Sequence, residues 1–285
     1  MRDRTLARLL VLPCALAILI LGIFPLIYAL HLSFHSWQLP SLEPQFVGLE
    51  NYANILQDKR FYWAIVRSCF FVVTTVGIQF LLGFTGAFVL SRGVRGLRLI
   101  GSLLLAPVMI APVAVGAIWL PLFDINFGLL NYCLGLIGLG KVEWLATPTN
   151  ALPCLMLIDI WQWTPFMLLI LLAGFQSIPR EPLEAARIGG ASEWRILRSI
   201  SLPMLTPVIG IALLLRGIDS FGKFFDTAYL LTRGGPGTSS ETLNLYIYEV
   251  GFKFFRLGYG AALSFTMLLL ALVGIAVFFK VFRVE

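Results

Sequence analysis

Residues 184–203 read EAARIGGASEWRILRSISLP and lie between two long apolar runs. This segment combines acids, bases, a glycine pair and helix-forming residues. Pro179 and Pro182 precede it, and proline suits the first turn of a helix, where a missing N–H costs nothing. Gly189 and Gly190 predict the end of that helix because glycine tolerates positive φ. The segment is therefore expected to open with a short helix and a tight turn.

A second helix is predicted directly after the turn. Ser192 followed by Glu193 has the chemistry of a helix cap and a first-turn acid. The helix would place Trp194 and Leu197 on one side, and Pro203 would open the next apolar run. The segment is therefore expected to be a helix–turn–helix with a mixed apolar and charged surface.

The same segment resembles the EAA loop of the permease subunits of binding-protein-dependent ABC importers. In that family the loop is cytoplasmic and docks into a cleft on the ATPase subunit. The resemblance implies an ion-pairing contact for Glu184, small docking surfaces at Ala185 and Ala186, and the turn at Gly190. One departure is Gly189, where the family commonly has Asp. The alternative is an ordinary amphipathic loop between membrane helices. The positions assigned to ATPase coupling are Glu184, Ala185, Ala186, Gly190, Trp194, Leu202 and Pro203.

The composition places the chain in a membrane. Hydrophobic residues make up 59% of it and charged residues 13%, and the mean hydropathy is +0.88, whereas soluble domains carry about 25% charged residues. Apolar runs of about 18 residues or more can span a bilayer. We expect an all-α polytopic membrane protein with about six transmembrane helices in a single permease domain, residues 1–285. The predicted spans are 9–32, 61–90, 99–123, 151–175, 202–225 and 261–282, with the coupling loop at 176–203.

The first and third predicted spans have distinctive features. The run 9–32 is longer than the apolar part of a signal peptide and lacks a clear cleavage site, so a retained helix is expected. The third span contains Pro107, Pro112 and Pro121, which predict a kinked interior helix whose freed carbonyls are satisfied by neighbours or by a cavity. The glycine-rich segment 124–150 predicts an external loop with short interfacial helices.

Basic residues decide the predicted orientation. If the amino terminus is inside, 12 of the 21 Lys and Arg residues fall in internal segments, and each internal segment is basic. The external segment 124–150 carries only Lys141. The positive-inside rule then favours two cytoplasmic termini and a cytoplasmic coupling loop. This orientation explains the net charge of +6, so nucleic-acid binding is not expected.

Two charged residues lie inside predicted spans. Asp159 lies about 12 Å from the outer end of the fourth span, and Arg216 about 9 Å from the outer end of the fifth, at about 1.5 Å per residue. Charges are costly in lipid, so Asp159 is predicted to meet either Arg216 or its neighbour in the helical turn, Gln162. A substrate contact and a purely structural pair that locks helices together both remain open.

Aromatic residues accompany Asp159 in the sequence DIWQWTPF, residues 159–166. Sugars bind to aromatic faces together with amide and carboxylate groups. Trp161, Gln162 and Trp163 are therefore candidates for a carbohydrate path with Asp159 and Arg216. Residues two apart on a helix do not share a face, so at most one of the tryptophans should point inward. The alternative for either tryptophan is an anchor at the membrane interface.

A second resemblance narrows the substrate class. Residues 226–236 resemble the FD…LTxGGP pattern of permeases for sugars such as maltose, polyols and glycerol phosphate, which implies a carbohydrate cargo. Glycine and proline also favour turns, so a tight external turn is predicted here. Further along, Gly258 and Gly260 predict a close approach of two helices. The matching positions are Asp226, Thr232, Gly234, Gly235 and Pro236.

Motifs for catalysis are absent from the sequence. No GxxxxGK[ST] loop occurs, so the chain is not expected to hydrolyse ATP. The four cysteines form no CxxC pair and the only histidines are His31 and His35, so no metal or catalytic site is expected. Cys14, Cys69 and Cys154 are interpreted as small apolar fillers. The chain is predicted not to be an enzyme and to hold no cofactor.

Resemblance to the importer family implies an assembly. Its expected members are a second, related permease subunit, two ATPase subunits that hold ATP and Mg²⁺, and an external solute-binding protein that delivers a sugar. The expected location is the bacterial inner membrane, with lipid around the spans. The expected mechanism is alternating access driven by closure of the ATPases.

The alternative function is an ion-coupled secondary carrier that works alone. Such carriers need intramembrane acids near the midplane and often show internal repeats. Asp159 is the only acid well inside a predicted span, and no convincing repeat of one half in the other is found. The importer subunit is therefore the favoured interpretation.

Overall fold

The computed structural model describes residues 11–41, 43–92, 101, 105–223 and 225–282. The chain divides into two compact units. The first comprises Met1–Trp63 and Tyr246–Leu272, and the second comprises Ala64–Leu245 and Val273–Glu285. Helices α4, α13 and α14 each have residues in both units.

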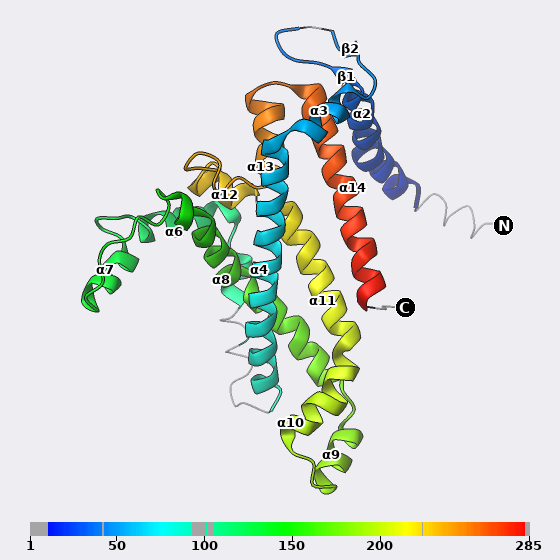
Figure 1. Cartoon of the computed structure of the whole chain (residues 1–285). Coiled ribbons are helices and arrows are strands. Elements are labelled where there is room, and N and C mark those ends of the chain that lie inside the picture. The colour runs from blue at the N-terminus through cyan, green and yellow to red at the C-terminus, as the bar shows by residue number, and fades with distance from the viewer. Residues whose placement is uncertain (1–10, 42, 93–100, 102–104, 224, 283–285) are drawn as a thin grey trace, which may run out of the picture. The chain divides into compact units, whose positions relative to one another are not determined.

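Helices dominate both units (Figure 1). The elements of the first unit are η1 (Leu19–Ile23), α2 (Phe24–Ser33), β1 (His35–Ser36), β2 (Gln45–Phe46), α3 (Glu50–Gln57), η3 (Glu249–Lys253) and most of α14 (Leu257–Phe282). The second unit holds most of α4 (Lys59–Leu90), α6 (Pro112–Leu122), α7 (Leu129–Leu136), α8 (Pro148–Ser177), α9 (Arg180–Ile188), α10 (Glu193–Ile196), η2 (Leu197–Ser201), α11 (Leu202–Lys223), α12 (Phe225–Leu231) and the start of α13 (Leu243–Tyr248).

Five helices of the described residues are long and apolar enough to cross a membrane, by length and composition. Four of them closely match the predicted spans 9–32, 61–90, 151–175 and 261–282. The first of these helices is described only from Val11 onward, because residues 1–10 lie outside the described part of the chain. The predicted class, an all-α polytopic membrane protein, is confirmed. The five helices are Val11–Ser33, Lys59–Leu90, Pro148–Ser177, Glu193–Gly222 and Leu257–Lys280.

The third predicted span, residues 99–123, is not a continuous helix. Residues 99–100 and 102–104 lie outside the described part, and helix is interrupted at Ile110 and Ala111 before α6 begins at Pro112. Proline lacks the N–H that would extend the preceding helix, which explains the interruption. Gln162 of α8 donates from Nε2 to the carbonyl of Ile110 at 3.1 Å. A neighbouring side chain thus satisfies a carbonyl at the break, as predicted.

The helix that contains the fifth predicted span begins before the span itself. Helix runs from Glu193 through Gly222 without a break, so Pro203 lies inside a continuous helix and not at its start. The chain accommodates this proline through η2, a π-helical turn in which the N–H of Leu202 bonds to the carbonyl of Leu197, five residues back. Such widening relieves the clash between a proline ring and the preceding turn.

Helices α4, α8 and α11 share the main core of the second unit. Glycines let them approach closely: a Cβ built at Gly83 of α4 would lie 3.0 Å from the backbone nitrogen of Leu168 in α8. A Cβ at Gly174 of α8 would lie 2.9 Å from Cγ1 of Val208 in α11. In this unit α9 and α10 lie at one end of these helices and α6, α7 and α12 lie toward the other (Figure 1).

The first unit is held together by close backbone contacts and buried amides. Asn51 of α3 donates from Nδ2 to the carbonyls of Ser33 and His35, at 2.9 and 3.0 Å. A Cβ built at Gly258 of α14 would lie only 1.9 Å from the carbonyl oxygen of His35. A Cβ at Gly260 would lie 3.0 Å from Cα of Gly251. The predicted close approach of two helices is confirmed at Gly260, which faces η3, whereas the element that approaches Gly258 is strand β1.

Two of the three cysteines interpreted as fillers do not lie in a core. Cys154 of α8 is buried, as predicted, whereas Cys14 and Cys69 are exposed. In a helix that crosses a bilayer, exposed apolar positions face lipid or a partner chain rather than water. Composition alone could not separate this surface from the interior.

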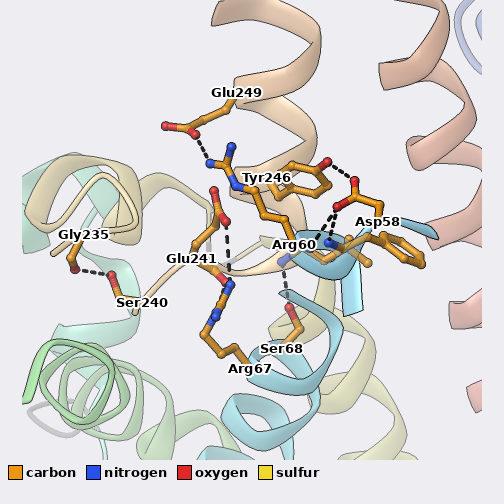
Figure 2. Close-up of polar contacts among 11 residues, drawn as sticks. Asp58, Arg60, Arg67, Ser68, Gly235, Ser240, Glu241, Tyr246 and Glu249 are labelled. Atoms are coloured by element: carbon orange, nitrogen blue, oxygen red, sulfur yellow. Dashed lines mark hydrogen bonds and ion pairs between the residues drawn. The ribbon is translucent and has the colours of Figure 1, made fainter. Parts of the chain in front are cut away.

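Asp58, which directly precedes α4, joins several parts of the first unit (Figure 2). Its Oδ2 accepts from the hydroxyls of Tyr246 and of Tyr259, the latter at 2.7 Å. Its Oδ1 accepts from the N–H groups of Arg60 and Phe61 at 2.9 and 3.2 Å, which caps the helix. Partial burial opposes ionisation, but the hydrogen bonds from Tyr246 and Tyr259 outweigh it and hold the pKa of Asp58 below its usual range.

We expect Asp58→Ala to lower the melting temperature of the purified protein in detergent by an amount on the order of 2–4 °C at neutral pH, because four donors lose their acceptor at a partly exposed site. The loss should shrink under acid conditions. A depressed pKa contributes stability above the unfolded value of about 3.9, and this contribution disappears as the pH falls through the lower folded pKa. Melting curves of both proteins between neutral and acid pH test this, and a constant difference would contradict it.

Candidate functional site

A cavity of about 290 Å³ lies in the second unit. Helices α6, α8, α11 and α12 contribute its lining. The lining includes Pro112, Asp159, Trp163, Arg216, Asp219 and Ser220. Most of the lining side chains are polar, aromatic or charged, so the cavity differs from an ordinary packing defect among apolar helices.

The structure brings Asp159 and Arg216 together, as predicted. The NH2 group of Arg216 donates to Oδ1 of Asp159 at 2.5 Å, and the two side chains are 1% and 2% exposed. Gln79 of α4 completes the bridge, because its Nε2 donates to Oδ2 of Asp159 at 2.8 Å and its Oε1 accepts from Nε of Arg216 at 3.0 Å. Asp219, one turn along α11, accepts from NH1 of Arg216 at 2.9 Å.

This network ties three membrane helices to one another. Gln79 lies on α4, Asp159 on α8 and Arg216 on α11. Removing one partner of a buried ion pair leaves an uncompensated charge and costs about 3–5 kcal/mol. The four side chains are therefore interdependent, and each position also forms or supports the cavity wall.

Of the two candidate tryptophans, only Trp163 lines the cavity. Its ring centroid lies 4.8 Å from Cζ of Arg216, which is a cation–π contact. Trp161 packs against Trp119 instead, with ring centroids 5.5 Å apart. One of the two tryptophans therefore faces the cavity, whereas Trp161 packs against a buried apolar cluster of the same unit. Gln162 also lines the cavity. Its amide nitrogen donates to the carbonyl of Ile110, where the helix is interrupted before α6.

One hydroxyl at the cavity has no internal partner. Ser220 of α11 is 3% exposed and lines the cavity, and its Oγ makes no hydrogen bond to any residue that the structure describes. Buried polar groups are almost always hydrogen-bonded. Water or a hydroxylated ligand in the cavity would satisfy this group.

Sequence reasoning missed Gln79, Asp219 and Ser220. Gln79 could have been found by the rule that singled out Asp159, since an amide inside a membrane helix also seeks a polar partner. Asp219 follows Arg216 by three residues, a spacing that places both on one helical face. Ser220 carried no comparable signal, because its environment depends on how α11 packs.

Residues 176–203, named the coupling loop after their predicted role, have the predicted helix–turn–helix structure. Helix α9 ends at Gly189, and Gly190 adopts a φ of +76°. Ser192 caps α10 by accepting from the N–H of Arg195 at 3.3 Å. Ile196 and Leu197 are buried in the second unit, so this end of the loop is anchored to the core.

Trp194 and Leu197 differ in burial. Trp194 is 69% exposed, whereas Leu197 is 4% exposed. Residues three apart on a helix differ by about 60° in direction, so the two share a side of the helix as predicted, but only Leu197 is buried in the core of the second unit. Glu184, Ala185 and Pro203 are also exposed, while Ala186 and Leu202 are partly buried.

Ion pairs on the coupling loop contribute little to its shape. Arg187 donates to Glu193 at 3.0 Å, and Arg92 contacts the same carboxylate at 3.2 Å. All three side chains are about half exposed, and exposed pairs are worth about 0–1 kcal/mol. The turn depends mainly on Gly190 and on the cap at Ser192.

The predicted turn at residues 232–236 is tight and continues into a buried segment. Thr232 accepts at its carbonyl from the N–H of Gly235 at 2.8 Å, and Gly234 has a φ of +83°. The hydroxyl of Ser240 lies 2.8 Å from the carbonyl of Gly235 (Figure 2). Proline at position 236 follows in the cis form.

Residues just after this turn join two helices of the second unit. The Nε of Arg67 in α4 donates to the carbonyl of Glu241 at 2.7 Å, and the N–H of Leu243 donates to Ser68 at 2.8 Å (Figure 2). Asn244 donates to the carbonyls of Phe221 and Gly222 at the end of α11. The turn thus supports the end of α11 that lines the cavity.

The described residues contain no group of three or more His, Cys, Asp or Glu side chains that could hold a metal ion. The two candidate sites are the cavity, for a solute, and the exposed surface of the coupling loop, for a partner protein.

Membrane-spanning helices, a polar cavity among them and an anchored helix–turn–helix are the features of a membrane transport subunit. Residues 79–283 match the family described as binding-protein-dependent transport system inner membrane component. The chain belongs to this family. It is a permease subunit, which is a transport component and not an enzyme.

Named relatives and solved structures agree with this assignment. The chain is 39% identical over 252 residues to the probable ABC transporter permease protein y4oQ of Sinorhizobium fredii, covering 88% of this chain and 81% of the relative. It is 34% identical to the trehalose/maltose transport system permease protein MalF of Thermococcus litoralis, covering 99% and 95%. A solved bacterial ABC transporter involved in import of the acidic polysaccharide alginate has a chain that matches with a TM-score of 0.82, 25% identity and coverage of 99% and 96%.

Proposed function

We propose that this chain is the permease subunit of an ATP-driven importer for a sugar or sugar-like solute, and that the cavity beside Trp163 lies on the solute path. The observation that carries the proposal is the cavity itself, in which an aromatic face, carboxylates and the unpartnered Ser220 hydroxyl meet. Sugars are bound by aromatic faces against their C–H sides and by polar groups at their hydroxyls. Relatives named for trehalose and maltose support the same class of solute.

The coupling loop docks on an ATPase subunit in this proposal. Its exposed surface carries Trp194, Ile188 and Glu184, an aromatic, an aliphatic and an acidic residue. Protein interfaces are enriched in aromatic side chains at their centres. Ile196 and Leu197 fix α10 in the core, and α10 continues through η2 into α11. A movement of the loop would therefore reach Arg216 and the cavity through one continuous helix.

The assembly contains a second permease subunit, two ATPase subunits and an external solute-binding protein. ATP and Mg²⁺ bind to the ATPase subunits, since this sequence has no phosphate-binding loop. Closure of the ATPases drives alternating access of the permease pair. A solved structure of the alginate transporter contains a saccharide-bound periplasmic protein in complex with it. This similarity supports the inclusion of a binding protein in the proposed assembly.

The proposed location is a bacterial inner membrane with both termini and the coupling loop in the cytoplasm. The arrangement of the second unit supports this, because α9 and α10 lie at the end of the long helices away from α7 and α12 (Figure 1). The loop containing α7 carries only Lys141 as a basic residue, whereas the coupling loop carries four arginines. The positive-inside rule then puts α9 and α10 inside.

Reconstitution in vesicles tests the function. The complex purified from native membranes is expected to take up radiolabelled maltose or trehalose when ATP and its binding protein are supplied, and to stop without ATP. The purified chain alone should not move sugar. Uptake by the chain alone, driven by an ion gradient, would identify a secondary carrier instead.

Trp163→Ala should lower sugar uptake by the complex more than about tenfold. The mutation removes the aromatic face that Trp163 contributes to the cavity and its cation–π contact with Arg216. Trp161→Ala is the matched control, since this neighbouring tryptophan packs against Trp119 outside the cavity. Sugar concentration dependence at saturating binding protein is the measurement. Equal losses in the two variants would contradict a role for the Trp163 face.

A further inference from the structure

The balance of charge in the cavity is acidic. Three carboxylates contribute to the lining, those of Asp159, Asp219 and Asp226, whereas Arg216 is the one cationic side chain among the described side chains that line it. Asp159 is buried in its bond to Arg216, but Asp219 is 20% exposed at its side chain and Asp226 is exposed. The carboxylates that a solute would meet first are thus those of Asp219 and Asp226.

Arg216 is already engaged by the protein through all three of its nitrogens. Nε donates to Gln79, NH1 to Asp219 and NH2 to Asp159. Trp163 covers a face of the guanidinium group at 4.8 Å. The side chain of Arg216 is also only 1% exposed, so an anionic ligand would meet the carboxylates of Asp219 and Asp226 before it could reach the remaining N–H groups of this arginine.

Uncharged hydroxyl groups meet no such obstacle. A hydroxyl can donate to the carboxylates of Asp219 and Asp226 and can accept from or donate to Ser220, whose Oγ lacks a partner within the described part of the chain. The ring of Trp163 offers an apolar face for the C–H side of a sugar ring. Every feature available to a ligand suits a neutral polyhydroxylated molecule.

We propose that this cavity selects uncharged saccharides and rejects anionic ones such as uronates and sugar phosphates. The inference rests on the proposed function, because it concerns the solute that the same cavity admits. Membership of the family leaves the charge of the solute open, since a solved relative takes part in import of an acidic polysaccharide. Here Asp219 is the specificity-determining residue, because it both holds NH1 of Arg216 and presents a negative charge to the cavity.

The test measures saccharide binding to the purified permease complex in the absence of its binding protein, which removes the selectivity of that protein. Maltose and digalacturonate, an uncharged and an anionic disaccharide, serve as probes, and saturation-transfer NMR detects weak binding of each. Wild-type complex should bind maltose at least about tenfold more tightly than digalacturonate, and raised salt should narrow the difference.

Asp219→Asn should reduce this preference severalfold, because it removes a negative charge and loosens NH1 of Arg216. Asp226→Asn should also reduce the preference for maltose. Because Asp226 is exposed, this variant keeps the test valid if Asp219→Asn does not fold. Glu143→Gln, at an exposed carboxylate outside the cavity, is the control and should keep the wild-type preference.

Equal binding of the two disaccharides by wild-type complex, or an unchanged preference in both aspartate variants, would overturn the inference while leaving the importer function intact. Binding of neither disaccharide would refute the role of the cavity in the proposed function, and the inference would fall with it. Tighter binding of digalacturonate would reverse the assignment of charge selectivity.

Discussion

Asp159→Arg is expected to abolish uptake and to reduce the amount of folded protein in the membrane severely. The substitution places a second positive charge against the buried guanidinium of Arg216, whose side chain is 1% exposed. Loss of one partner of a buried pair already costs about 3–5 kcal/mol, and repulsion adds to this. Folded protein is measured by fluorescence-detected gel filtration, and transport by uptake in vesicles.

The double variant Asp159→Arg with Arg216→Asp should recover part of the folded protein. Recovery should be incomplete because the new carboxylate at 216 would face Asp219, which now accepts from Arg216 at 2.9 Å. Adding Asp219→Asn should raise recovery further. Glu143→Arg is the control for charge reversal, since this side chain is exposed. Failure of both combinations to improve on the single variant would count against the pairing as the reason for the defect.

Gly190→Val is expected to leave membrane insertion intact and to lower ATP-driven uptake at least about tenfold while ATP hydrolysis continues. Gly190 has a φ of +76°, a region that costs L-residues roughly 1–2 kcal/mol and β-branched residues more. A Cβ at this position would meet nothing within 4 Å, so the effect comes from the backbone and not from a clash. The turn between α9 and α10 would change shape, and the docked surface with it.

Two other substitutions test whether the effect of Gly190→Val comes from the positive φ at position 190. Gly189→Ala should be tolerated, because Gly189 has a φ of −71°. Gly190→Asn should retain more coupling than Gly190→Val, because asparagine tolerates the left-handed region better than β-branched residues do. The ratio of sugar moved to ATP hydrolysed is the readout. A wild-type ratio in Gly190→Val would show that the conformation of this turn does not matter for coupling.

Local chemistry made the coupling loop and the ion pair predictable. A glycine pair followed by Ser192 and Glu193 predicts a turn and then a helix cap. The structure contains both the turn and the cap. Depth in the membrane narrowed the partner of Asp159 to Arg216 or Gln162, because the rise per residue of a helix and the thickness of the hydrocarbon core are known.

Features that depend on packing between helices could not be read from the sequence. The π-helical turn before Pro203 and the helix break before Pro112 are two responses to the same residue type, and the sequence around each does not say which one occurs. Gln79 reaches Asp159 and Arg216 because glycines such as Gly83 bring α4 close to α8. Ser220 became a candidate only when the cavity beside it was seen.

The most direct test of the account asks on which side of the membrane the coupling loop lies. A single-cysteine variant, with Trp194→Cys as the only thiol, is treated in spheroplasts with a maleimide that cannot cross the membrane. Position 194 is 69% exposed in this chain, so a reagent on the same side can reach it. The account predicts no labelling of spheroplasts and strong labelling of inverted vesicles made without the ATPase subunits, with protection when these subunits are added. Labelling of intact spheroplasts would contradict it, because a loop outside the cell cannot receive movement from an ATPase inside.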